Sequence, residues 1–184
     1  MKKLFMVMLG CKPKGRLTEQ HDVFFGIAEN LKDLIPHFNT FWPESNGEIH
    51  IDAWREITNV NGFEIKITSK QTQLNNKNSL FFINLGGYKP NQFDEFHYKL
   101  ITVAKSKTEA ISHSKQTSFF TDYNFKGGLS HIDDKYGVDV DDAFSIEEAL
   151  PQYFKEKYSI LISKTNVFNE DKLNIGYLNL KKLK

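Results

Sequence analysis

The chain has 184 residues, enough for one domain or for two small ones that each bury a core. It carries 24 Lys and Arg against 23 Asp and Glu, a net charge of +1, so no global field favours nucleic acid or an anionic membrane as a partner. Cys11, the only cysteine, excludes an intramolecular disulfide and a zinc site built from several cysteines. The sequence leaves homo-oligomerisation open.

The first eleven residues resemble an export signal. Lys2 and Lys3 precede the apolar run Leu4–Leu9, and Cys11 follows as in a lipoprotein cleavage box. This run is at or below the lower limit of roughly 7–15 residues for such a segment. A similar apolar segment recurs at 80–86, where no signal acts. We therefore expect an uncleaved, cytoplasmic protein.

The first half of the chain predicts strands and one helix. Leu4–Leu9 is typical of a strand buried on both faces. A helix is expected to begin near Thr18 and to stop at Pro36, because apolar residues follow at helical spacing: Phe24, Ile27, Ala28, Leu31 and Ile35. Alternation over 48–58 predicts a strand, and Asn61-Gly62 predicts a hairpin turn into a strand over 63–67.

The second half predicts a similar unit and an extension. Strand 80–86 precedes a helix expected from about Asp94. Ser145 is expected to cap a short helix, and Tyr158–Ile162 and Leu173–Leu180 are expected to form a hairpin. The predicted organisation is a first repeat at 1–68, a connector at 69–78, a second repeat at 79–144, and an extension at 145–184 that packs on the repeats.

An internal duplication is the strongest pattern in the sequence. Leu4–Gly10 and Leu80–Gly86 are identical at four of seven positions. The six histidines form three pairs: 21/97 and 37/113 at a shift of 76 positions, and 50/131 at a shift of 81. We therefore predict an α/β or α+β fold made of two βαββ units with pseudo-two-fold symmetry. The alternative is a duplicated βαβββ unit, as in glyoxalase-like metal enzymes.

Several of these motifs resemble one uncharacterised family, catalogued as domain of unknown function 1543. The residues that carry the resemblance are the opening apolar segment 4–10, Glu19-Gln20-His21-Asp22, Phe41-Trp42-Pro43, His50-Ile51-Asp52-Ala53-Trp54 and Leu85-Gly86-Gly87-Tyr88. The resemblance covers roughly residues 3–145 and implies two tandem copies of the domain. It implies no activity.

Two His-x-Asp pairs are candidate ligand or metal sites: His50 with Asp52, and His131 with Asp133. Residues two apart on a strand share a face, where they suit a divalent metal or a base with an orienting carboxylate. The structural alternative is a pair that satisfies itself by hydrogen bonding.

A second set consists of candidate anion-binding residues at the two expected helix N-termini: Lys12, Arg16, Glu19 and His21 in the first unit, and Glu95 and His97 in the second. The alternative is that the acids cap the helices. One site that joins His21 to His50 requires either an antiparallel strand over 48–58 or a long excursion by the loop at 37–47.

Two functions remain from these patterns. The first is a small-ligand-binding or interaction module built on the paired His, Asp and Glu positions. The second is a small metal-dependent enzyme that uses the two His-x-Asp pairs and a divalent metal as its cofactor. Cys11 has no counterpart in the second unit, where Gly87 replaces it, which argues against a nucleophilic role.

Overall fold

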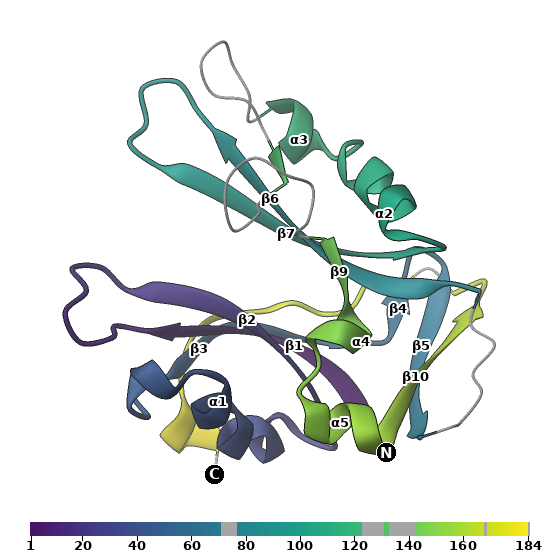
Figure 1. Cartoon of the computed structure of the whole chain (residues 1–184), viewed down its shortest axis with the longest axis horizontal. Coiled ribbons are helices and arrows are strands. Elements are labelled where there is room, and N and C mark those ends of the chain that lie inside the picture. Colours follow the sequence, from purple (N-terminus) through teal and green to yellow (C-terminus); the bar gives the residue numbers. More distant parts are fainter. Residues whose placement is uncertain (71–76, 123–130, 133–142, 168, 184) are drawn as a thin grey trace. The chain divides into compact units, whose positions relative to one another are not determined.

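The computed structural model describes residues 1–70, 77–122, 131–132, 143–167 and 169–183 (Figure 1). The chain divides into two compact units. Unit 1 comprises Met1–Leu74 with Leu150–Lys184, and unit 2 comprises Asn75–Ala149. Both consist of antiparallel strands and short helices, which confirms the predicted mixed α/β class.

Unit 1 contains two sheets. The larger has the strand order β11-β3-β1-β2, with β1 at Lys3–Cys11, β2 at Gln20–Ala28, β3 at His50–Ile57 and β11 at Asn174–Asn179. The smaller has the order β10-β5-β4, with β10 at Tyr158–Lys164, β5 at Phe63–Ser69 and β4 at Asn59–Val60. Asn61 and Gly62 both have positive φ, 50° and 77°, which confirms the predicted turn between β4 and β5.

The helix expected from Thr18 is wrong, because residues 20–28 form strand β2. All residues from Phe24 to Ala28 are buried, so the run is apolar on both faces of the sheet and its helical spacing is incidental. The centre of the run is close-packed, since a Cβ on Gly26 would lie 2.5 Å from the Phe24 ring and 2.7 Å from Leu34. The same correction applies to the second expected helix, because β7 occupies Glu95–Ala104.

The helical segments of unit 1 follow β2 instead. They are η1 at Leu31–Leu34, α1 at Ile35–Phe41 and η2 at Pro43–Ser45. Pro36 was expected to stop a helix, but it lies in the first turn of α1, where a missing N–H costs nothing. The rings of Phe24 and Phe38 meet edge to face at 5.1 Å, so α1 packs on β2. Each unit therefore begins strand, strand, helix.

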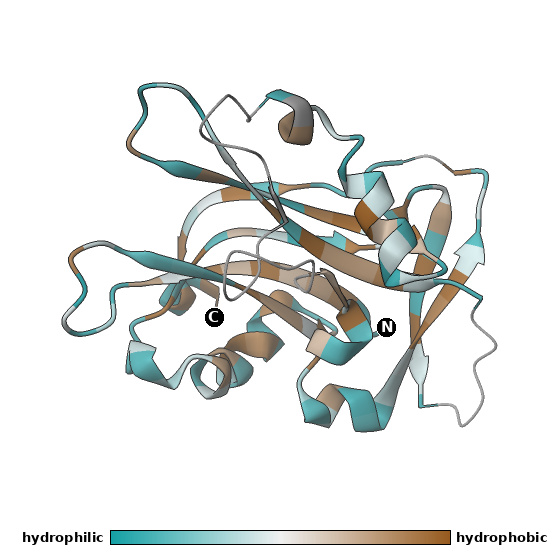
Figure 2. Cartoon of the chain, turned by 45° about the horizontal axis from the view of Figure 1, so that its top comes forward, coloured by the Kyte–Doolittle hydropathy of each residue, from teal (hydrophilic) through white to brown (hydrophobic). Residues whose placement is uncertain are grey.

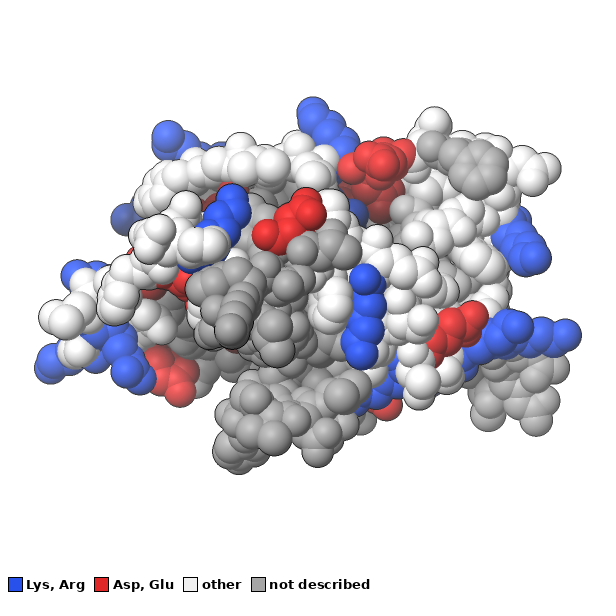
Figure 3. Space-filling model, turned by 90° about the horizontal axis from the view of Figure 1, so that it is seen from above, with Lys and Arg blue, Asp and Glu red and all other residues white. Residues whose placement is uncertain are grey.

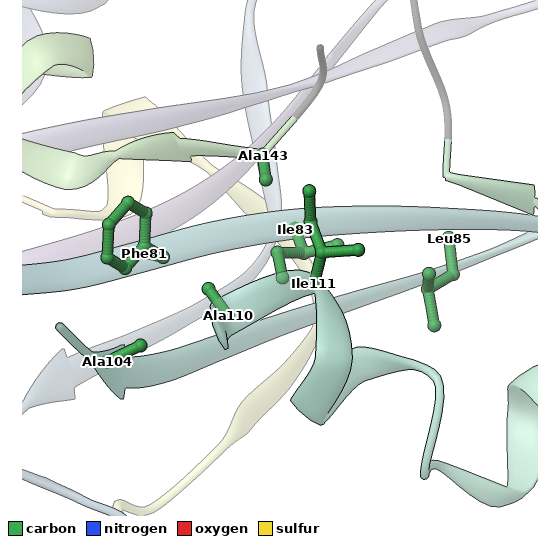
Figure 4. Packing of buried hydrophobic residues seen from close by; sticks show 7 residues of the cluster. All are labelled: Phe81, Ile83, Leu85, Ala104, Ala110, Ile111 and Ala143. Carbon is green, nitrogen blue, oxygen red and sulfur yellow. The ribbon is translucent and has the colours of Figure 1, made fainter. Parts of the chain in front are cut away.

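Unit 2 is organised around its own sheet, with the order β7-β6-β8, and β9 also pairs with β6. The bounds are β6 at Ser79–Tyr88, β8 at His131–Ile132, β9 at Ala143–Ser145, α2 at Lys107–Ser114, α3 at Ser118–Asp122 and α4 at Ile146–Ala149. Its core joins β6, β7, β9 and α2 through one aromatic ring and small or branched aliphatic side chains, labelled in Figure 4: Phe81, Ile83, Leu85, Ala104, Ala110, Ile111 and Ala143. Figure 2 shows hydrophobic residues along the strands and mostly hydrophilic tips on the two long hairpins.

The C-terminal segment corrects a second expectation. Its two strands exist, but they form no hairpin with each other, because β10 pairs with β5 and β11 pairs with β3. Each strand thus completes a sheet whose backbone groups would otherwise lack partners. The expected cap is confirmed: the Ser145 hydroxyl accepts from the Glu148 N–H, and the Glu148 carboxylate accepts from the Ser145 N–H. Helix α5 at Gln152–Lys157 and η3 at Leu180–Leu183 complete the chain.

Candidate metal site

The candidate site lies at Gly10, near the end of β1. Strand β1 pairs antiparallel with β2 on one side and with β3 on the other. In this register Gly10 is opposite His21 of β2 and also opposite His50 of β3. Directly opposed residues share one face of a sheet. The antiparallel β3, one of the two arrangements that the sequence left open, therefore brings the two histidines to the same place.

Four side chains converge at this point. Nε2 of His50 lies 2.5 Å from Oε1 of Glu19 and 3.3 Å from Oδ2 of Asp52. Nε2 of His21 lies 3.3 Å from the same Asp52 oxygen. The residues proposed as two separate sets, Glu19-His21 and His50-Asp52, thus form one cluster.

A β-bulge places Asp52 in this cluster. The register between β1 and β3 shifts at Met8 and Leu9, which are opposite Ala53 and Ile51. Asp52 is therefore the extra residue of β3 and has no direct counterpart on β1. Bulges re-aim side chains in this way beside functional sites. The shift also explains why Asp52 can face the same side as His50 while Trp54, opposite Val7, faces the other side.

Gly10 leaves the space that the cluster surrounds. A Cβ at this position would lie 2.4 Å from Oδ2 of Asp52, 2.5 Å from Nε2 of His50 and 2.9 Å from Oε1 of Glu19. Real Cβ atoms essentially never approach other atoms so closely. Glycine is therefore required for the cluster to assemble over β1.

The four side chains differ in burial. His50 is 15% exposed and Asp52 29%, whereas Glu19 and His21 are 43% and 47% exposed. Oδ2 of Asp52 is buried, yet it accepts no hydrogen bond from any described residue, although both imidazoles are nearby. A buried acceptor without a partner costs free energy. The lack of a hydrogen-bond partner for Oδ2 of Asp52 is therefore the feature of the cluster that requires a physical explanation.

The arrangement suits a divalent metal ion. Among the described residues, one group of three potential ligands has all its ligand atoms within 4.8 Å of one another: Glu19, His50 and Asp52. Ligand atoms bound tetrahedrally at about 2.0–2.2 Å are roughly 3.3–3.6 Å apart. The distances from Nε2 of His50 and from Nε2 of His21 to Oδ2 of Asp52, both 3.3 Å, match this spacing, and His21 lies outside the group of three because only its distance to Asp52 is this short. The shorter contact between Glu19 and His50 must open for both to bind one ion.

Sequence reasoning missed Tyr177 as a neighbour of this site. Its ring, on β11, lies 4.6 Å from the imidazole of His50 and is 67% exposed. The sequence predicted the strand that contains Tyr177 but gave no signal of its partner, because β11 and β3 are far apart in the chain. Tyr177 covers one side of the His50 ring.

In unit 2 the backbone register repeats the pattern. Gly86 of β6 is opposite His97 of β7 and opposite His131 of β8. The carboxylate of Glu95 accepts a hydrogen bond from the Tyr88 hydroxyl at 2.6 Å. Asp133 lies outside the described residues.

The third histidine pair is placed differently. His37 of α1 packs against the rings of Tyr153 and Phe154 at 5.4 and 4.7 Å, and this burial lowers its pKa. Nδ1 of His113 in α2 lies 3.1 Å from the Thr102 hydroxyl. Both residues hold a helix to its surroundings, so they belong to the framework of their units.

The anion-binding hypothesis assumed that a helix begins beside each of the two sets of residues. Lys12 and Arg16 lie in the exposed hairpin between β1 and β2, and no helix begins there. Glu95 and His97 lie on β7 rather than at a helix N-terminus. The free N–H groups of a helix end, on which that hypothesis depended, are therefore absent from both described segments.

Cys11 is buried, at 1% exposure. Burial raises the pKa of its thiol, and the negative charges of Glu19, Glu44 and Glu48 raise it further. A raised pKa keeps sulfur protonated and poorly nucleophilic. This agrees with the expectation that Cys11 is not a nucleophile.

Comparisons with known proteins give a family match over part of the chain and a similar fold over nearly all of it. Residues 16–67 match the family described as Domain of Unknown Function (DUF1543). The crystal structure of a protein, Il1583, from Idiomarina loihiensis is similar over 98% of both chains, with 18% identity and a TM-score of 0.62. At this identity the likeness shows the fold alone. No curated protein matches the sequence.

Two further observations concern membrane association and surface charge. Among the described helices, none has the length and apolar character of a membrane span. Figure 3 shows basic and acidic side chains interspersed over the face that it displays, in keeping with the balanced composition.

Proposed function

We propose that unit 1 is a small-ligand-binding module whose ligand is a divalent transition-metal ion, held by His21, His50 and Asp52 with Glu19 as a fourth ligand. One observation carries the proposal: the buried Oδ2 of Asp52 lies 3.3 Å from two imidazole nitrogens and accepts a hydrogen bond from neither. A cation among these atoms would bind the carboxylate oxygen and both nitrogen lone pairs together.

Electrostatics favours a cation here. Asp52 and Glu19 bring two carboxylates to one place, and no hydrogen bond offsets the desolvation of the buried Oδ2 of Asp52. A divalent ion compensates two negative charges. The half-exposed Glu19 and His21 give solvent, and hence an incoming ion, access to the cluster.

The ligand types narrow the choice of metal. Imidazole nitrogen with carboxylate oxygen suits Zn²⁺, Mn²⁺, Fe²⁺ and Ni²⁺, whereas Mg²⁺ and Ca²⁺ prefer oxygen ligands alone. Two histidines and one carboxylate also form the facial triad of non-haem iron enzymes.

Thermal unfolding tests the proposal. Metal-free protein should melt at a higher temperature when Zn²⁺, Mn²⁺, Ni²⁺ or Fe²⁺ is added. A free metal concentration of 100 times the dissociation constant should raise the free energy of unfolding by about 2.7 kcal/mol. His50→Ala should abolish this gain, and His37→Gln should retain it. If no metal raises the melting temperature, or if His50→Ala lowers it strongly in metal-free protein alone, the cluster is structural framework.

A metal-dependent enzyme is the second candidate, and the exposure of Glu19 favours it. With Asp52 and the two histidines on the ion, Glu19 would lie beside an open coordination position, where carboxylates act as general bases. A screen of Zn²⁺- and Mn²⁺-loaded protein against hydrolysable esters and phosphates, with Glu19→Gln alongside, separates the candidates. Activity that Glu19→Gln removes while metal content persists supports the enzyme.

We also propose that the chain arose by duplication, with repeats at 1–68 and 79–144, a connector at 69–78 and an extension at 145–184. The support is the shared register: a glycine of the central strand is opposite two histidines in each unit. His37 and His113, the remaining pair, both lie in the first α-helix after the hairpin.

A further inference from the structure

Strand β11 of unit 1 is irregular beside the metal cluster. Its register with β3 shifts between Ile175 and Leu178. Two residues of β11, Gly176 and Tyr177, therefore lie across from Asp52, the bulge residue of β3. Gly176 has a φ of 127°, a backbone conformation that residues with a side chain rarely adopt. The outer strand is thus distorted at the same level of the sheet as the bulge that places Asp52 in the cluster, and such irregularities re-aim side chains.

Tyr177 brings an aromatic surface to His50. The two rings are 4.6 Å apart at an angle of 38°, yet Tyr177 remains 67% exposed. The contact with the imidazole therefore covers only part of the tyrosine. Aromatic rings contribute large apolar contacts to binding sites, so the exposed part of this ring is a surface on which a molecule bound at the cluster can pack.

A second exposed apolar side chain, Ile175, lies on the same face of the sheet. Ile175 is opposite Ala53, and Ala53 is opposite Met8. Directly opposed residues share a face, and so do Met8 and Gly10, which are two residues apart on β1. Ile175 thus lies on the face that carries the cluster, about 7 Å further along the strands than Gly10. It is 80% exposed.

We infer that the metal site of unit 1 takes a small molecule with two parts: a head group whose oxygens bind the ion, and an aromatic or branched apolar group that packs on Tyr177 and Ile175. It rests on the metal site proposed above, because the ion supplies the polar contact and β11 the apolar one. Apolar walls with a few placed polar groups are typical of small-molecule sites.

Charge limits the head group. The carboxylates of Asp52 and Glu19 already balance the two positive charges of a divalent ion. A head group with a single negative charge therefore suits the site better than a doubly charged phosphate, which would meet uncompensated repulsion from these carboxylates. Carboxylates and hydroxamates meet this condition.

A matched pair of hydroxamates tests the inference. Benzohydroxamate and acetohydroxamate bind a metal through the same two oxygens, and they differ in carrying a phenyl or a methyl group. Full-length protein is loaded with Ni²⁺, its metal content is measured, and each compound is titrated into it by isothermal calorimetry. Wild type should bind benzohydroxamate about tenfold more tightly than acetohydroxamate, because the phenyl group packs on the tyrosine ring.

The variants locate this preference. Tyr177→Ala should remove most of it and leave the affinities for Ni²⁺ and for acetohydroxamate unchanged, whereas Tyr177→Phe should keep it. Tyr153→Ala is the matched control and should also keep the preference, because Tyr153 is an exposed tyrosine of the same unit that packs against His37 instead of His50.

The outcomes separate this inference from the proposed function. If wild type holds Ni²⁺ but Tyr177→Ala leaves the ratio of the two affinities unchanged, the apolar wall is refuted and the metal site stands. If wild type holds no Ni²⁺, both are refuted. Loss of Ni²⁺ from Tyr177→Ala would show that Tyr177 orients His50 instead of contacting the bound molecule, which also refutes the wall.

Two further measurements complete the test. A smaller molecular mass of Tyr177→Ala in light scattering would mean that a second copy of the chain covers β11, and this too would refute the wall. Should Tyr177→Ala fail to fold, as judged by circular dichroism, Ile175→Ala must still reduce the preference for benzohydroxamate, and an unchanged preference there would refute the wall.

Discussion

The regions around Gly10 and Gly86 have the same backbone frame and different carboxylate partners. In both, an antiparallel hairpin pairs a glycine with a histidine, and a third strand places a second histidine on the other side. In unit 1 the nearby glutamate contacts a histidine, whereas in unit 2 it is bound by a tyrosine hydroxyl. The comparison shows that the pairing register of the strands determines which residues lie opposite one another. Their hydrogen-bond partners then determine which of these side chains can bind a ligand.

Asp52→Asn should produce the largest effect. The amide keeps the shape but removes the charge from the buried oxygen position, so we expect zinc affinity at unit 1 to fall by more than about 100-fold, since even outer-shell changes cost 10- to 100-fold. Isothermal titration measures this. Metal-free Asp52→Asn should melt no lower than wild type, because it loses an unpaired buried acceptor. A large loss of metal-free stability would show that Asp52 is framework.

Gly10→Ala should follow in size. The added Cβ would overlap Asp52, His50 and Glu19 atoms, so the ligands must move apart and zinc affinity should fall roughly 10- to 100-fold. The change should also destabilise the fold by about 1–3 kcal/mol, as overpacking does, measured by urea unfolding. Gly86→Ala is the matched variant and should leave the affinity of unit 1 unchanged. Equal losses in both variants would mean that the effect is general to the fold.

Glu19→Gln should have a smaller effect. Glu19 is 43% exposed and already contacts His50, so its loss removes one ligand from the open side and should weaken zinc binding about tenfold. Glu95→Gln, at the corresponding position, should not change the affinity of unit 1. Titration of both variants with the same metal checks this, and an unchanged affinity in Glu19→Gln would remove Glu19 from the ligand set.

Substitution of His37 should have the smallest effect, which is a change in how the free energy of unfolding depends on pH. Burial lowers the pKa of His37 below its ordinary value of 6.5. As pH falls through about 6.5, the unfolded chain takes up a proton at this position before the folded protein does, so the free energy of unfolding decreases. His37→Phe should flatten this decrease in urea titrations between pH 7.5 and 5. An unchanged slope would contradict the account.

Part of the architecture was predictable from the sequence because the signals were local. Continuous apolar runs predicted β1 and β6, alternation predicted β3, and Asn61-Gly62 predicted a turn. Strand β2 was not predictable, because Phe24, Ile27 and Ala28 fit helical spacing equally well. Only burial on both faces of a sheet, a tertiary property, made a strand of them.

The site was half predictable for the same reason. The His50-Asp52 pair and the Glu19-His21 pair were each visible as spacings within one segment. The two pairs form one cluster because β3 pairs antiparallel with β1 and because β3 has a bulge at Asp52. Neither feature produces a recognisable pattern in the sequence of a single strand. Tyr177 comes from a strand that joins this sheet from the far end of the chain.

The central claim is that the cluster over Gly10 binds a metal ion, and anomalous diffraction from crystals of the zinc-loaded protein tests it most directly. The account predicts a zinc peak within about 2.0–2.2 Å of Nε2 of His50, Nε2 of His21 and Oδ2 of Asp52. A zinc-loaded structure with no peak over Gly10, and with Glu19 still in contact with His50, would contradict it.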